Sequence, residues 1–215
     1  NYYDGKGLEG LVRKIYRGDM NNDMLKTYLK EIISEHLYYI PQSGVIHNEI
    51  FDYELSYCIQ PLLEIIEEYA DICLIDTVGC QLLSTKAILE EADLIVVNLC
   101  QKQSILENFF LNYSSVIPKA IIIISNYEFN SRLNYRKIAK MYELPPEDLT
   151  VIPDNVSYDN AYKNGVIVEF LSRNYSCSRE SDNYLFMQAV KKAAYMIIKK
   201  AVHLCRSRER ASCLS

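Results

Sequence analysis

Short runs of consecutive apolar residues, each following a helix-like segment, constrain the fold of this chain more than any other feature of its sequence. Four runs are bounded by polar or turn residues and occupy 72–76, 94–99, 120–125 and 150–152, and a fifth occupies 37–40. Runs that are apolar at successive positions, and not at every second one, fit strands that are covered on both faces. They therefore predict the buried strands of a parallel sheet.

Segments typical of helices lie between these runs. The predicted helices are 23–33, 49–69 with an interruption at Pro61, 83–91, 104–113, 135–142 and 182–203. Alternation of strand and helix along a chain implies right-handed crossovers between parallel strands. The predicted fold class is α/β, with a doubly wound, mostly parallel sheet and helices on both of its faces.

Composition excludes several classes of protein. The 215 residues are 49% hydrophobic and 24% charged, which is the balance of a globular protein and not of a disordered or collagen-like one. The longest uncharged apolar runs are far shorter than the roughly 20 residues of a membrane span. The 7 cysteines are odd in number and contain no C-x-x-C pair, and the 3 histidines lie far apart. Neither a disulfide framework nor a zinc site is indicated, and a reducing cytoplasm is expected.

Basic residues gather near the end of the chain, although the formal net charge is −5. Their segment also carries an apolar face at helical spacing, for which core packing is the first explanation. We expect an α/β domain over 1–180 and an amphipathic helix with a basic tail over 181–215. The basic side chains predict either a solvated face or a surface for an anionic membrane or for DNA. They are Lys191, Lys192, Lys199, Lys200, Arg206, Arg208 and Arg210.

Polar residues follow the predicted strands at the positions where α/β sheets bind ligands. The run 72–76 ends in Asp76, and Gly79 comes three residues later. A carboxylate at a strand end is where P-loop nucleotide hydrolases hold hydrated magnesium, and glycine lets a backbone amide approach a phosphate closely. Ser84 is predicted to cap the helix that follows.

Four segments in their order resemble the ParA/MinD family of ATPases, including its CpaE and TadZ-like branch associated with pili and the cell pole. They read Tyr-Ala-Asp-Ile-Cys-Leu-Ile-Asp-Thr (69–77), Ala-Asp-Leu-Ile-Val-Val-Asn (92–98), Ile-Ile-Ile-Ile-Ser-Asn (121–126) and Val-Ile-Pro-Asp (151–154), the last followed by Ala161 and Gly165. The resemblance extends over roughly residues 35–175 and implies a P-loop NTPase-like fold.

The resemblance also implies roles for single residues. Asp76 would support magnesium through water, and Gly79 would belong to the loop that senses the γ-phosphate. Asn126 would hydrogen-bond the adenine edge, with Pro153 and Asp154 beside the base. In the intact protein, ATP and Mg²⁺ are therefore the implied cofactors.

The phosphate loop of that family is absent from these 215 residues. The segment Asp-Gly-Lys-Gly at 4–7 lacks the G-x-x-x-x-G-K-[ST] spacing and follows no predicted strand. We therefore expect the carboxyl-terminal two thirds of an ATPase, which by itself binds no nucleotide and hydrolyses no ATP. The family's central strand would be missing between 72–76 and 94–99, so we expect a gap there or direct pairing of these two strands. A strand donated by residues 1–18 would instead indicate a complete domain.

As to function, the resemblance implies a nucleotide-dependent positioning or partitioning switch that forms a homodimer. Such a protein is expected in the cytoplasm, and peripherally at the membrane, the cell pole or the nucleoid. The alternative is an interaction or localisation protein that keeps the α/β scaffold without ATP turnover. A response-regulator-like domain is disfavoured because no acidic pair precedes a phosphoacceptor aspartate.

Overall fold

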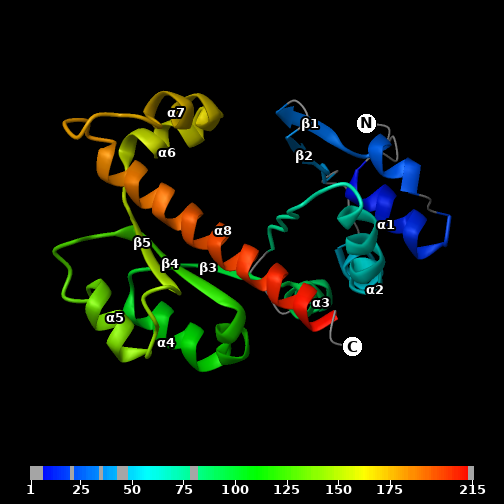
Figure 1. The fold of residues 1–215 in the computed structure, drawn as a ribbon, viewed down its shortest axis with the longest axis horizontal. Coiled ribbons are helices and arrows are strands. Elements are labelled where there is room, and N and C mark those ends of the chain that lie inside the picture. Colours follow the sequence, from blue (N-terminus) through cyan, green and yellow to red (C-terminus); the bar gives the residue numbers. More distant parts are fainter. Residues whose placement is uncertain (1–6, 20–21, 34–35, 43–47, 78–81, 213–215) are drawn as a thin grey trace. The chain divides into compact units, whose positions relative to one another are not determined.

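The chain forms two compact units, Asn1–Ala92 and Asp93–Ser215. A computed structural model describes residues 7–19, 22–33, 36–42, 48–77 and 82–212 (Figure 1). The first unit contains an antiparallel hairpin and helices, and the second contains a parallel sheet covered by helices. The boundary expected after residue 180 falls within the second unit and stays a prediction.

The elements of unit 1 are α1 (Leu8–Tyr16), the 3-10 helix η1 (Asn22–Thr27), β1 (Lys30–Ile33), β2 (Leu37–Tyr39), α2 (Asn48–Glu67) and α3 (Leu83–Glu91). Strands β1 and β2 pair antiparallel with Lys30 opposite Tyr39. The core of the unit joins apolar residues of the three α-helices, because α1 and α3 both pack against α2. Its buried members are Leu11, Val12, Leu25, Tyr28, Leu55, Cys58, Ile59, Leu62 and Ile88.

Several predictions for unit 1 are wrong. The run 37–40, predicted as a buried strand of a parallel sheet, forms β2, which pairs antiparallel with the nearby β1 and is exposed. The expected helix 23–33 is instead a 3-10 helix followed by strand β1. The last two residues of this strand, Ile32 and Ile33, are β-branched and therefore favour a strand. Helix α2 continues through Pro61 instead of being interrupted there. Proline removes one hydrogen bond of the helix, but Cys58, Ile59 and Leu62 are buried on either side of it and hold both halves in the core.

Unit 2 contains β3 (Ile95–Cys100), α4 (Gln103–Asn112), the 3-10 helix η2 (Ser114–Lys119), β4 (Ala120–Tyr127), α5 (Tyr135–Met141), β5 (Leu149–Pro153), α6 (Val156–Lys163), α7 (Ile167–Asn174) and α8 (Tyr184–Ser212). Its sheet has the order β3-β4-β5, and both pairings are parallel. The register places Ile95 opposite Ala120 and Ile122 opposite Leu149. The predicted strands 94–99, 120–125 and 150–152 are thereby confirmed within two residues at either end.

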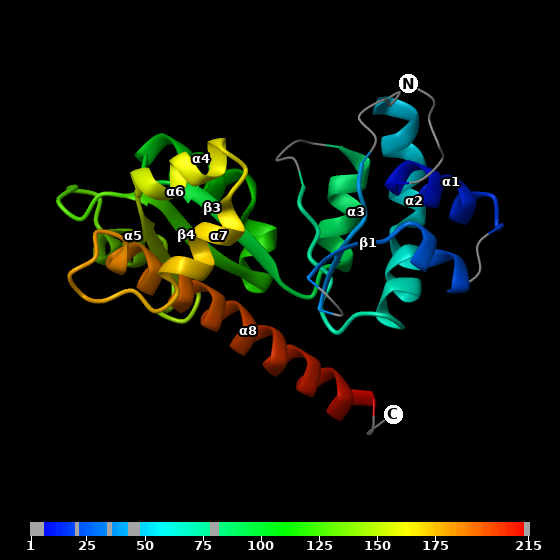
Figure 2. The ribbon, with the colours of Figure 1, turned by 90° about the horizontal axis from the view of Figure 1, so that it is seen from above.

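Helices cover both faces of this sheet (Figure 1 and Figure 2). Ile122 and Ile124 of β4 pack on one face with residues of α4 and α5. Ile121 and Ile123 pack on the other face with Ala193 of α8. This alternation explains why β4 is apolar at successive positions. The α/β class is confirmed. The doubly wound arrangement stays a prediction, because both crossover helices, α4 and α5, lie on the same face of the sheet. The sheet has three strands in the described part of the chain.

The predicted strand 72–76 is not a strand. Residues 72–77 are extended, but no described strand pairs with them, and they belong to unit 1. Among the described residues, β3 pairs only with β4, so the direct pairing of 72–76 with 94–99 does not occur. The segment 8–16 forms helix α1 and donates no strand. An apolar run becomes a strand only when a neighbouring backbone accepts its hydrogen bonds, and this run has no such neighbour in the described part.

Candidate functional site

A cavity of about 430 Å³ lies where the carboxyl ends of β4 and β5 meet the beginning of α8. Parallel strands end at the same edge of a sheet, which is the edge where such folds bind ligands. The residues that line the cavity follow β4, end or follow β5, or lie at and near the start of α8. They are Tyr127, Glu128, Phe129, Asn130, Pro153, Asp154, Asn155, Asp182, Leu185 and Phe186.

The β4 side of the cavity begins at a backbone turn. Asn126 has a positive φ of 48°, and the pairing with β5 shifts register between Ile124 and Tyr127. Asparagine adopts this left-handed conformation more readily than most residues. Tyr127 stays buried beyond the turn, and its hydroxyl accepts a hydrogen bond of 2.8 Å from the backbone N–H of Tyr135.

Gln101, at the end of β3, fixes the loop that follows β4. Its Oε1 accepts a hydrogen bond of 2.7 Å from the N–H of Glu128. Its Nε2 donates to the carbonyl of Leu133 at 2.8 Å. Both ends of the loop 128–133 are thus held by one side chain from the neighbouring strand. Sequence reasoning did not single out this contact, because its partners lie 27 and 32 residues apart.

Three asparagines hold the β5 side. Asn155 caps α6 by accepting a hydrogen bond from the N–H of Tyr158 at 2.7 Å, and it donates to Asn183 at 3.0 Å. Asn183 in turn donates to Asn174 at 2.9 Å. The chain of amides ties the ends of α6 and α7 to the start of α8. Sequence reasoning missed it, because the three residues are brought together only by the packing of these helices.

The lining of the cavity combines aromatic rings with carboxylates. Tyr127 and Phe129 meet edge to face with their ring centroids 5.2 Å apart. Glu128, Asp154 and Asp182 supply carboxylates, and none of the described lining residues is Lys or Arg. Such a site suits a flat, apolar group that carries N–H donors. It repels a phosphate, because like charges brought together are destabilising.

The two halves of the predicted nucleotide site fall in different units. Pro153 and Asp154 line the cavity of unit 2, and Asn126 directly precedes its lining residue Tyr127. Asp76 lies in the extended segment of unit 1, and Gly79 lies outside the described residues. The described side chains include no cluster of three or more His, Cys, Asp or Glu residues that could hold a metal ion. Mg²⁺ is usually held by one or two carboxylates together with water and substrate phosphates, so the water-mediated role of Asp76 stays a prediction.

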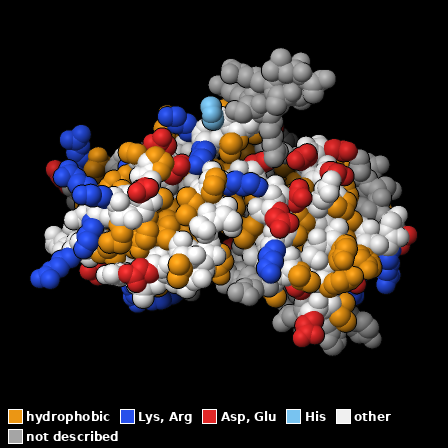
Figure 3. Space-filling model, turned by 90° about the horizontal axis from the view of Figure 1, so that it is seen from below, with side chains coloured by type: hydrophobic (Ala, Val, Ile, Leu, Met, Phe, Trp, Pro, Cys, Tyr) orange, Lys and Arg blue, Asp and Glu red, His pale blue; other side chains and the backbone are white. Residues whose placement is uncertain are grey.

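The predicted basic surface is partly occupied by contacts within unit 2. Lys191 donates to the carbonyl of Tyr175 and lies over its ring, and Lys200 pairs with Asp148. Lys192 and Lys199 are exposed. The side chains of Arg206, Arg208 and Arg210 lie outside the described part. On the face drawn in Figure 3, Lys and Arg are dispersed among hydrophobic and acidic side chains. None of the helices within the described ranges has the length and hydrophobicity to cross a membrane.

Asp52 of α2, and not Ser84, caps helix α3. Its carboxylate accepts hydrogen bonds from the N–H of Leu83 at 3.0 Å and from the N–H of Ser84 at 2.9 Å. Desolvation by itself raises the pKa of Asp52, but the hydrogen bonds from Ser84 and Leu83 together outweigh it and leave the pKa below its ordinary value of 3.8. The sequence could not show this cap, because its acceptor lies about 30 residues before the helix that it caps.

Asp52→Ala is expected to destabilise unit 1 by about 0.5–2 kcal/mol, the usual range for loss of a helix cap. Because the pKa of Asp52 is lower in the folded state, its contribution to the free energy of unfolding is complete above pH 3.8. This contribution is lost as the pH falls through the folded-state pKa. Urea titrations between pH 3 and pH 7 should therefore show that the difference in free energy of unfolding between wild type and Asp52→Ala shrinks as the pH is lowered. Asp71→Ala, which removes an exposed carboxylate, is the control, and an equal loss in both variants would contradict the cap.

Comparison of the chain with family models, with curated proteins and with solved structures found no match. The resemblance to ParA/MinD ATPases therefore stays a prediction that is carried by the quoted segments.

Proposed function

We propose that unit 2 is the base-binding part of an adenine-nucleotide-dependent positioning or partitioning switch of the ParA/MinD type. The observation that supports this most is the cavity at the carboxyl ends of β4 and β5. Pro153 and Asp154, expected beside the base, line this cavity. Asn126, expected at the adenine edge, directly precedes the lining residue Tyr127.

Adenine fits the chemistry of this cavity. An asparagine amide can pair with the N6 amino group and N7 of adenine through two hydrogen bonds. The carboxylates of Glu128 and Asp154 can accept the remaining N–H, and the rings of Phe129 and Phe186 offer apolar surface to the flat base. The phosphates would point away from the cavity, because its lining is acidic. We assign base recognition to unit 2 and no hydrolysis step.

A second function, as an interaction protein without turnover, is favoured by one observation in unit 1. Ile72 and Leu74 of the extended segment are 61% and 82% exposed. Exposed apolar side chains next to one another are typical of a surface that another molecule covers.

Without a phosphate loop no stable nucleotide binding is expected, so the base alone, supplied as adenosine, should bind unit 2 only weakly, in the millimolar range or about −4 kcal/mol. Saturation-transfer NMR with the full chain should detect adenosine and should detect guanosine and uridine less strongly. Asn126→Gly keeps the left-handed turn and removes the amide, so it should weaken adenosine binding on the order of tenfold.

The matched control is Glu143→Gly. Glu143 is the other described non-glycine residue with a positive φ, 53°, and it does not line the cavity. Its replacement should leave adenosine binding unchanged. Equal signals from all three nucleosides, or equal effects of the two glycine substitutions, would contradict the proposed base site.

A further inference from the structure

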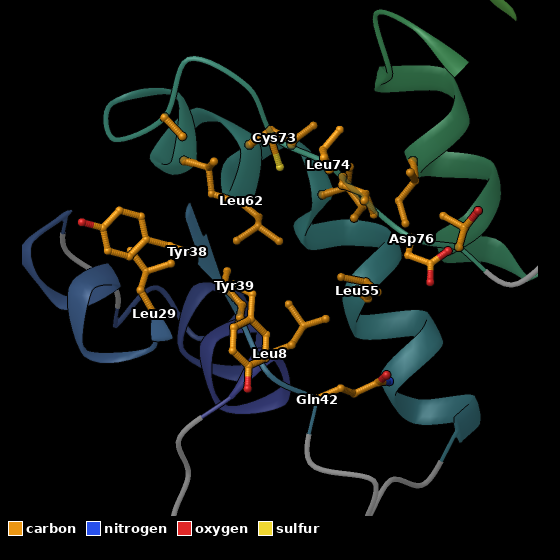
Figure 4. A pocket seen from close by; sticks show the side chains of 18 of the residues that line it. Leu8, Leu29, Tyr38, Tyr39, Gln42, Leu55, Leu62, Cys73, Leu74 and Asp76 are labelled. Atoms are coloured by element: carbon orange, nitrogen blue, oxygen red, sulfur yellow. The ribbon is translucent and has the colours of Figure 1, made fainter. Parts of the chain in front are cut away.

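The backbone of residues 71–77 has no hydrogen-bonding partner in the described part of the chain. Its trace runs stretched out past Cys73, Leu74 and Asp76 (Figure 4), and none of its N–H or C=O groups forms a hydrogen bond with another described residue. Its sequence, Asp-Ile-Cys-Leu-Ile-Asp-Thr, has an apolar centre and an aspartate at position 71 and at position 76. It thus has the composition of a strand, and among the described residues its backbone groups are unpaired.

This segment forms one wall of a cavity of about 930 Å³ in unit 1. Figure 4 shows side chains from three further elements around the same space: Leu8 of α1, Tyr38 and Tyr39 of β2, and Leu55 and Leu62 of α2. Strand β2 pairs with β1, which is its one neighbouring strand among the described residues. The cavity is therefore bounded by strand β2 and by a segment whose backbone pairs with no other described residue.

The charges of the cavity have one sign. Three aspartates, Asp52, Asp71 and Asp76, line it, and none of its described lining residues is Lys or Arg. The carboxylate of Asp52 already caps α3. Asp71 and Asp76 accept no hydrogen bond from a described residue and stand near the two ends of the apolar run. An occupant that matches them carries positive charge at both ends and apolar groups between.

We propose that unit 1 binds an extended polypeptide strand with an apolar centre and a basic residue near each end, which pairs with the backbone of 71–77. Addition of a strand to free backbone groups gives affinity through main-chain hydrogen bonds, and alternate side chains give specificity. The added strand buries Ile72 and Leu74 and fills the cavity. A lipid or another apolar small molecule would fill the same space and leave the N–H and C=O groups unpaired. The inference concerns unit 1 and does not depend on base binding by unit 2.

Three fluorescein-labelled peptides of eight residues test the proposal on the full chain. The first has lysine at both ends around Val-Thr-Val-Ile-Val-Thr, the second has glutamate at both ends, and the third keeps the lysines but is N-methylated at every second residue. Fluorescence anisotropy should show saturable binding of the first peptide and at least tenfold weaker binding of the other two. Hydrogen exchange of the amides in 71–77 should slow at least tenfold when the first peptide is bound.

Leu74→Asp should weaken the first peptide at least tenfold, because it places a charge in the apolar centre of the segment. Leu111→Asp of α4 is the matched control: Leu111 is 81% exposed against 82% for Leu74, and it does not line the cavity. Unchanged circular dichroism of both variants would show that neither is unfolded. Equal binding of the N-methylated peptide, or unchanged amide exchange in 71–77, would overturn the proposal and indicate a cavity for apolar ligands instead.

Discussion

Ile124→Ala is expected to lower the free energy of unfolding of unit 2 by about 2–5 kcal/mol, the range for large-to-small substitutions in a core. Ile124 is fully buried in the central strand β4. It packs in one cluster with Leu106 of α4, Ile138 of α5 and Leu149 of β5. Removal of three carbon atoms there leaves a cavity beneath both crossover helices, and the paired backbone of the sheet limits its collapse.

Near-ultraviolet circular dichroism is a suitable probe for this experiment, because the chain has 18 tyrosines and no tryptophan. Amide exchange in β4 would report on unit 2 directly. Ile198→Ala is the control, since Ile198 of α8 is 53% exposed and its loss should change stability by less than about 0.5 kcal/mol. A loss below 1 kcal/mol for Ile124→Ala would contradict the described core.

Lys200→Met is expected to destabilise unit 2 by about 1–3 kcal/mol, because it leaves two acceptors without their charged donor. The Nζ of Lys200 donates to the carboxylate of Asp148 and, at 3.0 Å, to the carbonyl of Ala120. It thereby joins α8 to the start of β4 and to the loop before β5. Both side chains of the ion pair are about one fifth exposed. The loss should therefore stay below the roughly 3–5 kcal/mol of a fully buried pair.

Lys199→Met is the matched control, because the neighbouring Lys199 is exposed and carries the same charge. Urea unfolding at low and at high salt would compare the two variants. We expect the loss in Lys200→Met to persist at high salt, since partly buried pairs are screened less than exposed ones. Equal stability of both variants would show that Lys200 is an ordinary surface lysine.

Much of unit 2 could be predicted because its signals are local. The run 120–125 is apolar at successive positions, and only a strand between two layers of helices buries every one of them. Pro153 and Asp154 end and follow β5 as the strand prediction implied, and they therefore lie at the edge where parallel strands end together. Helices α6 and α7 were not predicted. Among their residues only Ala161 and Phe170 are buried, and both pack in one cluster with Phe186 and Met187 of α8.

Local patterns in the sequence were enough to predict the α/β class, the three parallel strands and the helices 83–91, 104–113 and 135–142, because hydrophobic periodicity and turn residues act over short stretches of chain. The folded structure was needed to show that Asp52 caps α3, that Gln101 holds the loop after β4, and that Lys200 is an ion-pair partner. It also decided that 72–76 is no strand. Each of these outcomes depends on which groups come within hydrogen-bonding distance across 20 or more residues, and a local pattern carries no information about that distance.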